Sequence, residues 1–268
     1  MRHAAVAGSW YPGNPSGLAA EVDRYLSDAT FESPPRPPRA LIAPHAGLMY
    51  SGPVAAFAYK LLEGIACRAL VLVGPSHFVP FRGVSIWRSG EWETPFGPVR
   101  VEQTLADAIS ADCALVVDLP AAHGREHSLE MQLPFIAHLL PDVPIVPLVM
   151  GHQTRETAFA LGDALARTLT PDVLIVASSD LSHYENAVVA TEMDAIVIRH
   201  VEALDPDGLM DALEVEPRHA CGGGPMVSVL HAARQLGASD ARVLRYADSG
   251  DVSGDKSSVV GYLAAAVF

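Results

Sequence analysis

Histidines follow apolar runs at several places in the chain. The run ALIA ends just before His45, and the run ALVLV ends shortly before His77. A third run, VLIVA, precedes Asp180 and His183. Imidazole serves as a general acid or base near neutral pH and is a common ligand of transition metals. These side chains, placed where buried strands end, predict a site for metal binding or acid–base chemistry.

A cysteine near the C-terminal end of the chain extends this set. Cys221 stands before three glycines and Pro225, where an apolar pattern of helical spacing begins. We expect Cys221 at the start of that helix, where the helix dipole favours a thiolate. Imidazole with thiolate suits Zn, Cu or Fe, and two His with one Cys leave a coordination position open. The alternative is a buried cysteine packed in a tight turn.

Two further groups have candidate roles beside such an ion. His183 is positioned to act as acid or base, and Asp180 either takes part directly or orients a histidine. The segment HGREHSLEMQLPF holds His127 and Glu130, but it does not match the helical zinc motif, which requires a glutamate directly after its first histidine. The simpler interpretation is a helix that opens at Ser128.

The elements that would position these residues alternate between short apolar runs and longer helical patterns. Strands are predicted at 40–43, 69–73, 83–87, 114–117, 144–149, 173–177, 241–247 and 257–263. Helices are predicted at 16–29, 51–63, 102–111, 128–140, 155–169, 187–203, 206–213 and 225–236. This alternation predicts a largely parallel sheet with helices on both faces. In such sheets ligands bind at the carboxyl ends of the strands.

The predicted fold is a single α/β domain, residues 1–268, with a central mixed β-sheet. The proline-rich segment 30–39 is a loop that leads into the first buried strand, and segment 85–101 is an antiparallel excursion with a turn at a glycine. His45 and His77 are 32 residues apart, about the length of one βαβ unit, so we expect their strands to be neighbours.

The composition narrows the function classes. Half of the 268 residues are hydrophobic and the net charge is −13, so a sizeable core is expected and direct nucleic-acid binding is disfavoured. No apolar stretch is long enough to span a membrane, and the first residues do not form a convincing signal peptide. Three cysteines indicate a reducing compartment, so we expect a cytoplasmic protein.

Seven short motifs then occur in a characteristic order: AGSWYPG, APHAGLMYSGPVAAFAY, GPSHF, TPFGPV, EHSLEMQLPF, SSDLSHY and CGGGP. In this order and spacing they resemble the Memo-like family over essentially the whole chain. Bacterial and archaeal members are often called the B component of the AmmeMemoRadiSam system. The family is similar to class III extradiol dioxygenases, which implies an α/β domain with a mixed sheet.

The resemblance also implies roles for individual residues. His45, His77 and Cys221 match the expected metal ligands, and His183 matches the acid/base histidine of the dioxygenases, with Asp180 in the same segment. Iron(II) or copper is the implied metal, with zinc possible in purified protein. A cysteine where the dioxygenases carry a carboxylate leaves the reaction open. The resemblance further implies that Trp10 and Tyr11 line a ligand-binding pocket, with an anchor in the core as the alternative for this aromatic pair. His127 and Glu130 match as further substrate-binding candidates.

Several functions are compatible with these residues. The first is a dioxygenase-like redox enzyme with an unknown substrate. The alternatives are a non-catalytic module that binds a small molecule or a peptide, a metal-handling protein, and a partner of AMMECR1-like and radical-SAM proteins. Loss of turnover with metal retained in a His183→Ala variant would distinguish the enzyme from the others. The oligomeric state stays open.

Overall fold

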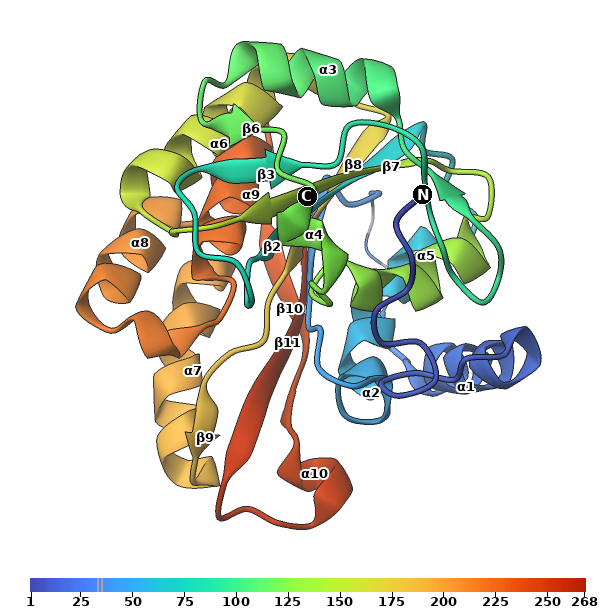
Figure 1. Cartoon of the computed structure of the whole chain (residues 1–268). Helices are drawn as coiled ribbons and strands as arrows, with labels where there is room; N and C mark the ends of the chain where they lie inside the picture. Colours follow the sequence, from blue (N-terminus) through green and yellow to red (C-terminus); the bar gives the residue numbers. More distant parts are fainter. Residues whose placement is uncertain (33, 35) are drawn as a thin grey trace.

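A mixed β-sheet runs through the centre of the molecule (Figure 1). The computed structural model describes residues 1–32, 34 and 36–268, so the proline-rich loop predicted over 30–39 lies partly outside the described residues. Within the described part the main sheet has nine strands, eight of them in the order β10-β11-β1-β8-β2-β7-β3-β6, with β9 paired to β11. Their bounds are β1 Ala40–Ala43, β2 Ala69–Pro75, β3 Val84–Ile86, β6 Val116–Val117, β7 Ile145–Met150, β8 Val173–Ser178, β9 His183–Glu185, β10 Ala241–Asp248 and β11 Val259–Val267.

The four central strands β1, β8, β2 and β7 are mutually parallel. Antiparallel pairing begins on either side of them, at β1 with β11 and at β7 with β3. A separate two-stranded ribbon, β4 (Glu91–Trp92) and β5 (Val99–Arg100), forms the predicted antiparallel excursion. The fold is therefore the predicted α/β architecture with a mixed sheet.

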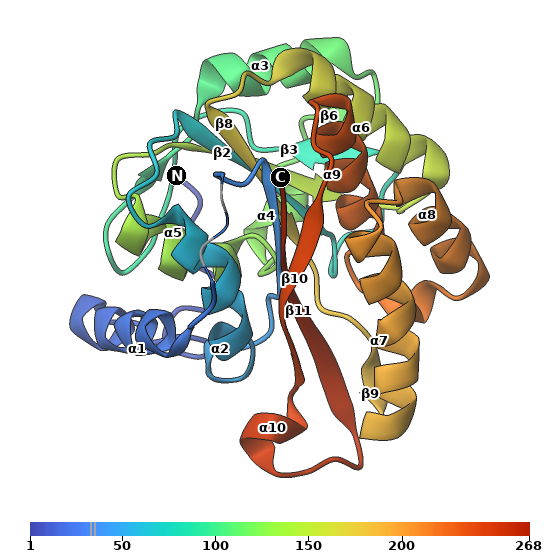
Figure 2. The same ribbon diagram turned by 180° about the vertical axis from the view of Figure 1, so that it is seen from behind.

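Helices cover both faces of the sheet (Figures 1 and 2). One face carries α1 (Pro15–Asp28), α2 (Leu48–Tyr59), α4 (Ala121–Gly124) and α5 (Leu133–Leu139). The other carries α3 (Gln103–Asp112), α6 (Arg155–Thr168), α7 (Ala187–Glu202), α8 (Pro206–Val215) and α9 (Gly223–Gln235). The short α10 (Gly250–Ser253) lies between β10 and β11, and the 3-10 turns are η1 (Lys60–Leu62), η2 (Glu130–Gln132) and η3 (Pro217–His219).

The apolar runs are continuous because both faces of the central strands are buried. In β2, Val71 and Val73 belong to the core under α6 and α9, whereas Leu70 and Leu72 belong to the core under α2 and α5. All four are fully buried. Side chains of a strand alternate between the two faces, so a strand covered twice needs apolar residues at every position.

The boundaries differ from the prediction where the turn chemistry was misassigned. The helix predicted over 16–29 begins one residue earlier, at Pro15, because it is capped by Asn14, whose side chain accepts a hydrogen bond from the backbone N–H of Gly17. The helix predicted over 128–140 is split into η2 and α5, with Pro134 in the first turn of α5. Proline lacks an N–H, so it is well placed in a first turn and poorly placed further inside a helix.

The predicted adjacency of the strands before His45 and His77 is wrong, because β8 lies between β1 and β2. The interposed strand is itself the one that leads to Asp180. Among the described residues, no helix has the length and apolar character needed to cross a bilayer.

Candidate metal centre

Three predicted site residues leave the sheet at matching positions. His45 stands two residues after the end of β1, His77 two residues after β2, and Asp180 two residues after β8. Since these strands are parallel neighbours in the order β1-β8-β2, their carboxyl ends bring the three residues to one edge. Cys221 reaches the same place from the loop before α9.

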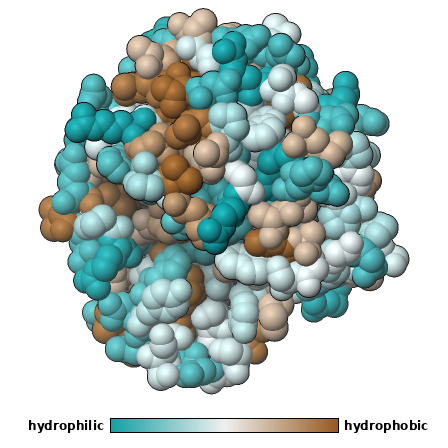
Figure 3. All heavy atoms as spheres, in the orientation of Figure 1, coloured by the Kyte–Doolittle hydropathy of each residue, from teal (hydrophilic) through white to brown (hydrophobic). Residues whose placement is uncertain are grey.

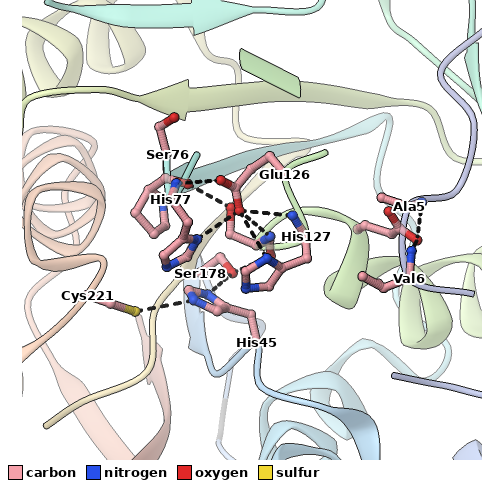
Figure 4. A network of polar contacts seen from close by, with 12 residues as sticks. Ala5, Val6, His45, Ser76, His77, Glu126, His127, Ser178 and Cys221 are labelled. Carbon is pink, nitrogen blue, oxygen red and sulfur yellow. Dashed lines mark hydrogen bonds and ion pairs between the residues drawn. The ribbon is translucent and has the colours of Figure 1, made fainter. Parts of the chain in front are cut away.

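The side chains converge closely (Figure 4). The Nε2 atom of His45 lies 3.2 Å from the Sγ atom of Cys221, and the ring centroids of His45 and His77 are 5.2 Å apart. Two sets of possible metal donors share His45: one with His77 and His127, the other with Asp180 and Cys221, and the donor atoms within each set lie within 4.8 Å of one another. His45 therefore lies close to both His77 and Cys221, and His127 joins the first set, whereas His77 and Cys221 share neither set.

A serine fixes which nitrogen of His45 faces the cluster. The Ser178 hydroxyl donates its hydrogen to the backbone oxygen of Ser128 at 2.7 Å and accepts a hydrogen bond from the Gln132 amide at 2.7 Å. The Nδ1 atom of His45, 2.9 Å from the same hydroxyl, must therefore be the donor. The lone pair of His45 is left on Nε2, the atom that faces Cys221.

A buried glutamate does the same for His77. The Glu126 carboxylate accepts hydrogen bonds from Nδ1 of His77 at 2.9 Å and from the backbone N–H of His77 at 2.5 Å. It also accepts hydrogen bonds from the backbone N–H groups of His127 at 2.9 Å and Ser128 at 2.8 Å. Burial alone would raise its pKa, but the bonds to His77 outweigh burial and lower the pKa of Glu126 to about 2. A carboxylate behind a histidine is a common support of metal ligands.

The imidazoles of His45 and His127 are held in their neutral, metal-binding form. Burial and then the neighbouring His77 lower the pKa of His45 well below its usual value. Burial and then His45 lower the pKa of His127 to about 4. The rings of His77 and His127 are stacked with centroids 4.6 Å apart, so the three rings form one wall of the cluster.

The thiol of Cys221 differs from the sequence expectation. Burial and then the Asp180 carboxylate raise the pKa of Cys221, so the helix dipole does not make it a thiolate. The N–H groups at the start of α9 are used elsewhere: Gly222 donates to the Ser179 hydroxyl and Gly224 to the Gln153 side chain. A bound cation would favour the thiolate, because metal ions deprotonate the thiols that coordinate them.

The spacing of His45 and Cys221 fits two ligands of one transition-metal ion. With bonds of about 2.0 Å to nitrogen and 2.3 Å to sulfur, two ligands of one ion stand about 3.0 to 3.6 Å apart, depending on the coordination angle. The observed 3.2 Å between His45 Nε2 and Cys221 Sγ falls in this range. Nitrogen and sulfur donors select Zn, Cu or Fe and disfavour Mg and Ca.

Glycines bring the cysteine loop against the sheet. A Cβ atom at Gly222 would stand 2.4 Å from the backbone oxygen of Ser178, closer than real Cβ atoms come. A Cβ atom at Gly223 would stand 2.6 Å from Leu213 of α8. The glycines after Cys221 therefore permit close packing on both sides of the loop.

Asp180 and His183 take different positions. One oxygen of the Asp180 carboxylate accepts the backbone N–H of His45 at 2.7 Å and that of Ala46 at 3.3 Å, so Asp180 holds the chain at His45. His183 belongs to neither donor set found among the described residues. Its Nδ1 atom lies 2.8 Å from the backbone oxygen of Leu181, which accepts a hydrogen there and leaves Nε2 of His183 for proton transfer.

The residues predicted to line the ligand pocket divide into two pairs. The Trp10 ring is 39% exposed and lies against His127, with centroids 4.4 Å apart, so this pair does border the cluster. Tyr11 is buried and donates its hydroxyl hydrogen to Glu130 at 2.7 Å. Glu130 also accepts the backbone N–H groups of Ala5 and Val6, so in this structure it anchors the N-terminal segment.

The Glu130 anchor includes a buried ion pair. Arg2 and Glu130 are in direct contact, and their side chains are 1% and 0% exposed. The Arg2 guanidinium also donates to the backbone oxygens of His123 and Glu126 and lies over the Trp92 ring. The N-terminal segment is thereby joined to the residue that orients His77.

Sequence reasoning missed Glu126, Ser178 and Gln132. Glu126 directly precedes His127 in the motif EHSLEMQLPF, and Ser178 opens the motif SSDLSHY. All three residues lie inside the motifs EHSLEMQLPF and SSDLSHY, but they support the candidate ligands and are not ligands themselves. A carboxylate next to a candidate histidine is the signal that could have found Glu126.

Comparison with known proteins identifies the family of the chain. The sequence matches the family described as Memo-like protein over residues 2–266. A MEMO1 family protein of Sulfolobus acidocaldarius is 40% identical over 283 residues, and one of Methanothermobacter thermautotrophicus is 38% identical over 273; in both cases 98% of each chain is covered. A MEMO1 family protein of Thermotoga maritima is 36% identical and covers all of this chain.

A solved structure shows the same fold at lower identity. The crystal structure of the uncharacterized protein JW3007 from Escherichia coli K12 aligns with a TM-score of 0.61 at 18% identity, over 86% of this chain and all of that one. With the full-length family match and the full-length relatives, the chain belongs to the Memo-like protein family.

Proposed function

We propose that this protein is a metal-dependent redox protein of dioxygenase-like type, with iron or copper held by His45, His77 and Cys221. The observation that carries the proposal is the cluster in which the His45 Nε2 and Cys221 Sγ atoms stand 3.2 Å apart. When bound, such a metal would supply Lewis acidity and a one-electron couple beside a substrate.

The chain's own residues would prepare the site. Ser178 and Glu126 keep protons on the Nδ1 atoms of His45 and His77, so that both rings offer their Nε2 lone pairs. His183 would accept or donate a proton at Nε2, its ring held by the hydrogen bond to Leu181. Trp10 and His127 would cover a substrate from one side.

Metal analysis with electron paramagnetic resonance, on protein purified without oxygen, tests the proposal. We expect about one equivalent of iron or copper, lost in His45→Ala and in Cys221→Ser. Matched controls are His138→Ala, a histidine paired with Asp23 away from the cluster, and Cys67→Ser; both should retain the metal. Native protein that cannot be loaded with iron or copper would refute the proposal.

A second comparison separates catalysis from metal storage. If the protein is an enzyme, His183→Ala abolishes turnover in a substrate screen while the metal content is unchanged. His127→Gln tests the additional donor: unchanged metal content assigns His127 to the substrate, and metal loss assigns it to the ion.

A further inference from the structure

A cavity is lined in part by the cysteine loop, and no histidine is among the described residues that line it. It has a volume of about 520 Å³ and is bounded by α8, by the start of α6 and by the loop from Ala220 to Gly224. In Figure 4 the Cys221 side chain enters from one side and its sulfur points toward His45. Cys221 therefore belongs both to the lining of this cavity and to the donor cluster.

The inner lining of the cavity is apolar. Met210 and Leu213 of α8 are 3% and 7% exposed, and Ala220 is 5% exposed. Figure 3 shows the outer surface in the orientation of Figure 1, where hydrophobic and hydrophilic residues are interspersed. A volume of a few hundred cubic ångströms with mostly apolar walls is typical of small-molecule sites.

The charges at the rim are already paired. Arg155 contacts Asp211 at 2.5 Å and Glu214 at 2.8 Å, so the positive charge faces two carboxylates. An anion entering here would meet a cation that is already neutralised and a surplus of negative charge. The rim therefore selects against anionic ligands.

The loop beside the cavity is fixed by a side chain that also lines it. The Gln153 amide donates to the backbone oxygen of Cys221 at 2.7 Å and accepts the N–H of Gly224 at 2.7 Å. A group lying in the cavity would touch Gln153, Gly223 and Gly224 together with Cys221. Contacts of this group with the loop would therefore affect the position of the Cys221 thiol.

We propose that this cavity binds an uncharged, apolar small molecule that packs against the loop carrying Cys221. An influence of this molecule on the metal centre rests on the proposed metal function, whereas the binding itself does not. The site is distinct from the face of the cluster bordered by Trp10 and His127.

The experiment titrates the full chain, stripped of metal by a chelator, with the neutral dye Nile red and with the anionic dye 1-anilinonaphthalene-8-sulfonate. We expect a blue-shifted, saturable Nile red signal with one site and an affinity at least tenfold higher than that of the anionic dye. Leu213→Trp, which fills the cavity, and Glu214→Trp, which covers its mouth, should each weaken Nile red binding at least tenfold.

The matched control is Val215→Trp. Val215 follows Glu214 in α8, is 86% exposed and does not line the cavity, so this variant should bind the dye as the wild type does. Glu214 is exposed, which keeps the test informative if Leu213→Trp fails to fold.

Alkylation by iodoacetamide tests whether the dye binds beside Cys221. The extent of modification is measured by mass spectrometry for each cysteine-containing peptide. Saturating Nile red should slow modification of Cys221 at least fivefold and leave Cys67 unchanged. Dye binding that both tryptophan variants retain, equal affinity for the anionic dye, or no protection of Cys221 would each overturn the proposal. Since the protein is metal-free throughout, a failed metal analysis does not affect this result.

Discussion

Replacing Glu126 by glutamine tests the reasoning about how His77 is held. In the wild type both carboxylate oxygens accept hydrogen bonds: one from Nδ1 of His77 and the backbone N–H groups of His127 and Ser128, the other from the backbone N–H of His77. A glutamine of the same shape offers only one acceptor oxygen. Its NH₂ group must face at least one donor, and that buried donor loses its partner.

The magnitude follows from the pKa of Glu126. Its value of about 2 lies below the usual 4.5, and this difference corresponds to about 3 kcal/mol of stabilisation by the charged carboxylate in the folded state. Because the folded-state pKa is the lower one, the stabilisation is complete above the unfolded-state value and is lost as the pH falls from about 4.5 toward 2. Glu126→Gln should therefore lower the free energy of unfolding by about 3 kcal/mol at pH 7, and by less below about pH 4.5.

Urea unfolding of the metal-free protein at several pH values measures the first effect. The second is metal affinity, measured against a chelator of known affinity, which should fall about 10- to 100-fold because His77 is no longer oriented. Glu130→Gln is the matched control: it removes a buried carboxylate that contacts the N-terminal segment, so it should reduce stability and change metal affinity about threefold at most. Wild-type metal affinity in Glu126→Gln would refute the orienting role.

Three other changes have definite expected outcomes. Gly222→Ala should lower the free energy of unfolding by about 2 kcal/mol or more in thermal unfolding and reduce the metal content, because the added Cβ atom has no space. Gly124→Ala is the control and should have neither effect, because the space around Gly124 is open. Arg2→Met leaves Glu130 buried without its cation and should destabilise the fold by about 3 to 5 kcal/mol in urea unfolding. Adding Glu130→Gln to this variant should restore part of the lost stability, because no buried charge is then left unpaired. Tyr184→Gly should raise stability by up to about 1 kcal/mol, because Tyr184 has a φ of 64°, which glycine adopts without strain; a lower melting temperature would contradict this.

The order of elements was predictable because the burial pattern is strong. The strands β1, β2, β7 and β8 are buried at every position and almost entirely apolar, a pattern typical of strands covered on both faces. The ligand types were predictable for a related reason, since parallel strands deliver their following residues to one edge. The strand order was not predictable, because no sequence pattern indicates that β8 lies between β1 and β2.

The supporting residues of the site were harder to predict than the ligands. Ser178 and Glu126 act through hydrogen bonds to residues 133 and 49 positions away. Glutamate and serine are common residues, and nothing in their types marks them as partners of a particular ring. The raised pKa of Cys221 escaped prediction too, because it depends on burial and on Asp180 in three dimensions.

The placement of Arg2 has a consequence for the order in which the molecule is built. Its partners His123, Glu126 and Glu130 lie 121 to 128 positions further along the chain. During synthesis Arg2 therefore cannot form its ion pair until the chain has been made as far as Glu130. β1 waits longer, since it pairs with β8 and β11. Contacts between such distant residues form slowly, so the wall beside His127 and the edge that carries His45 are expected to be completed late in folding.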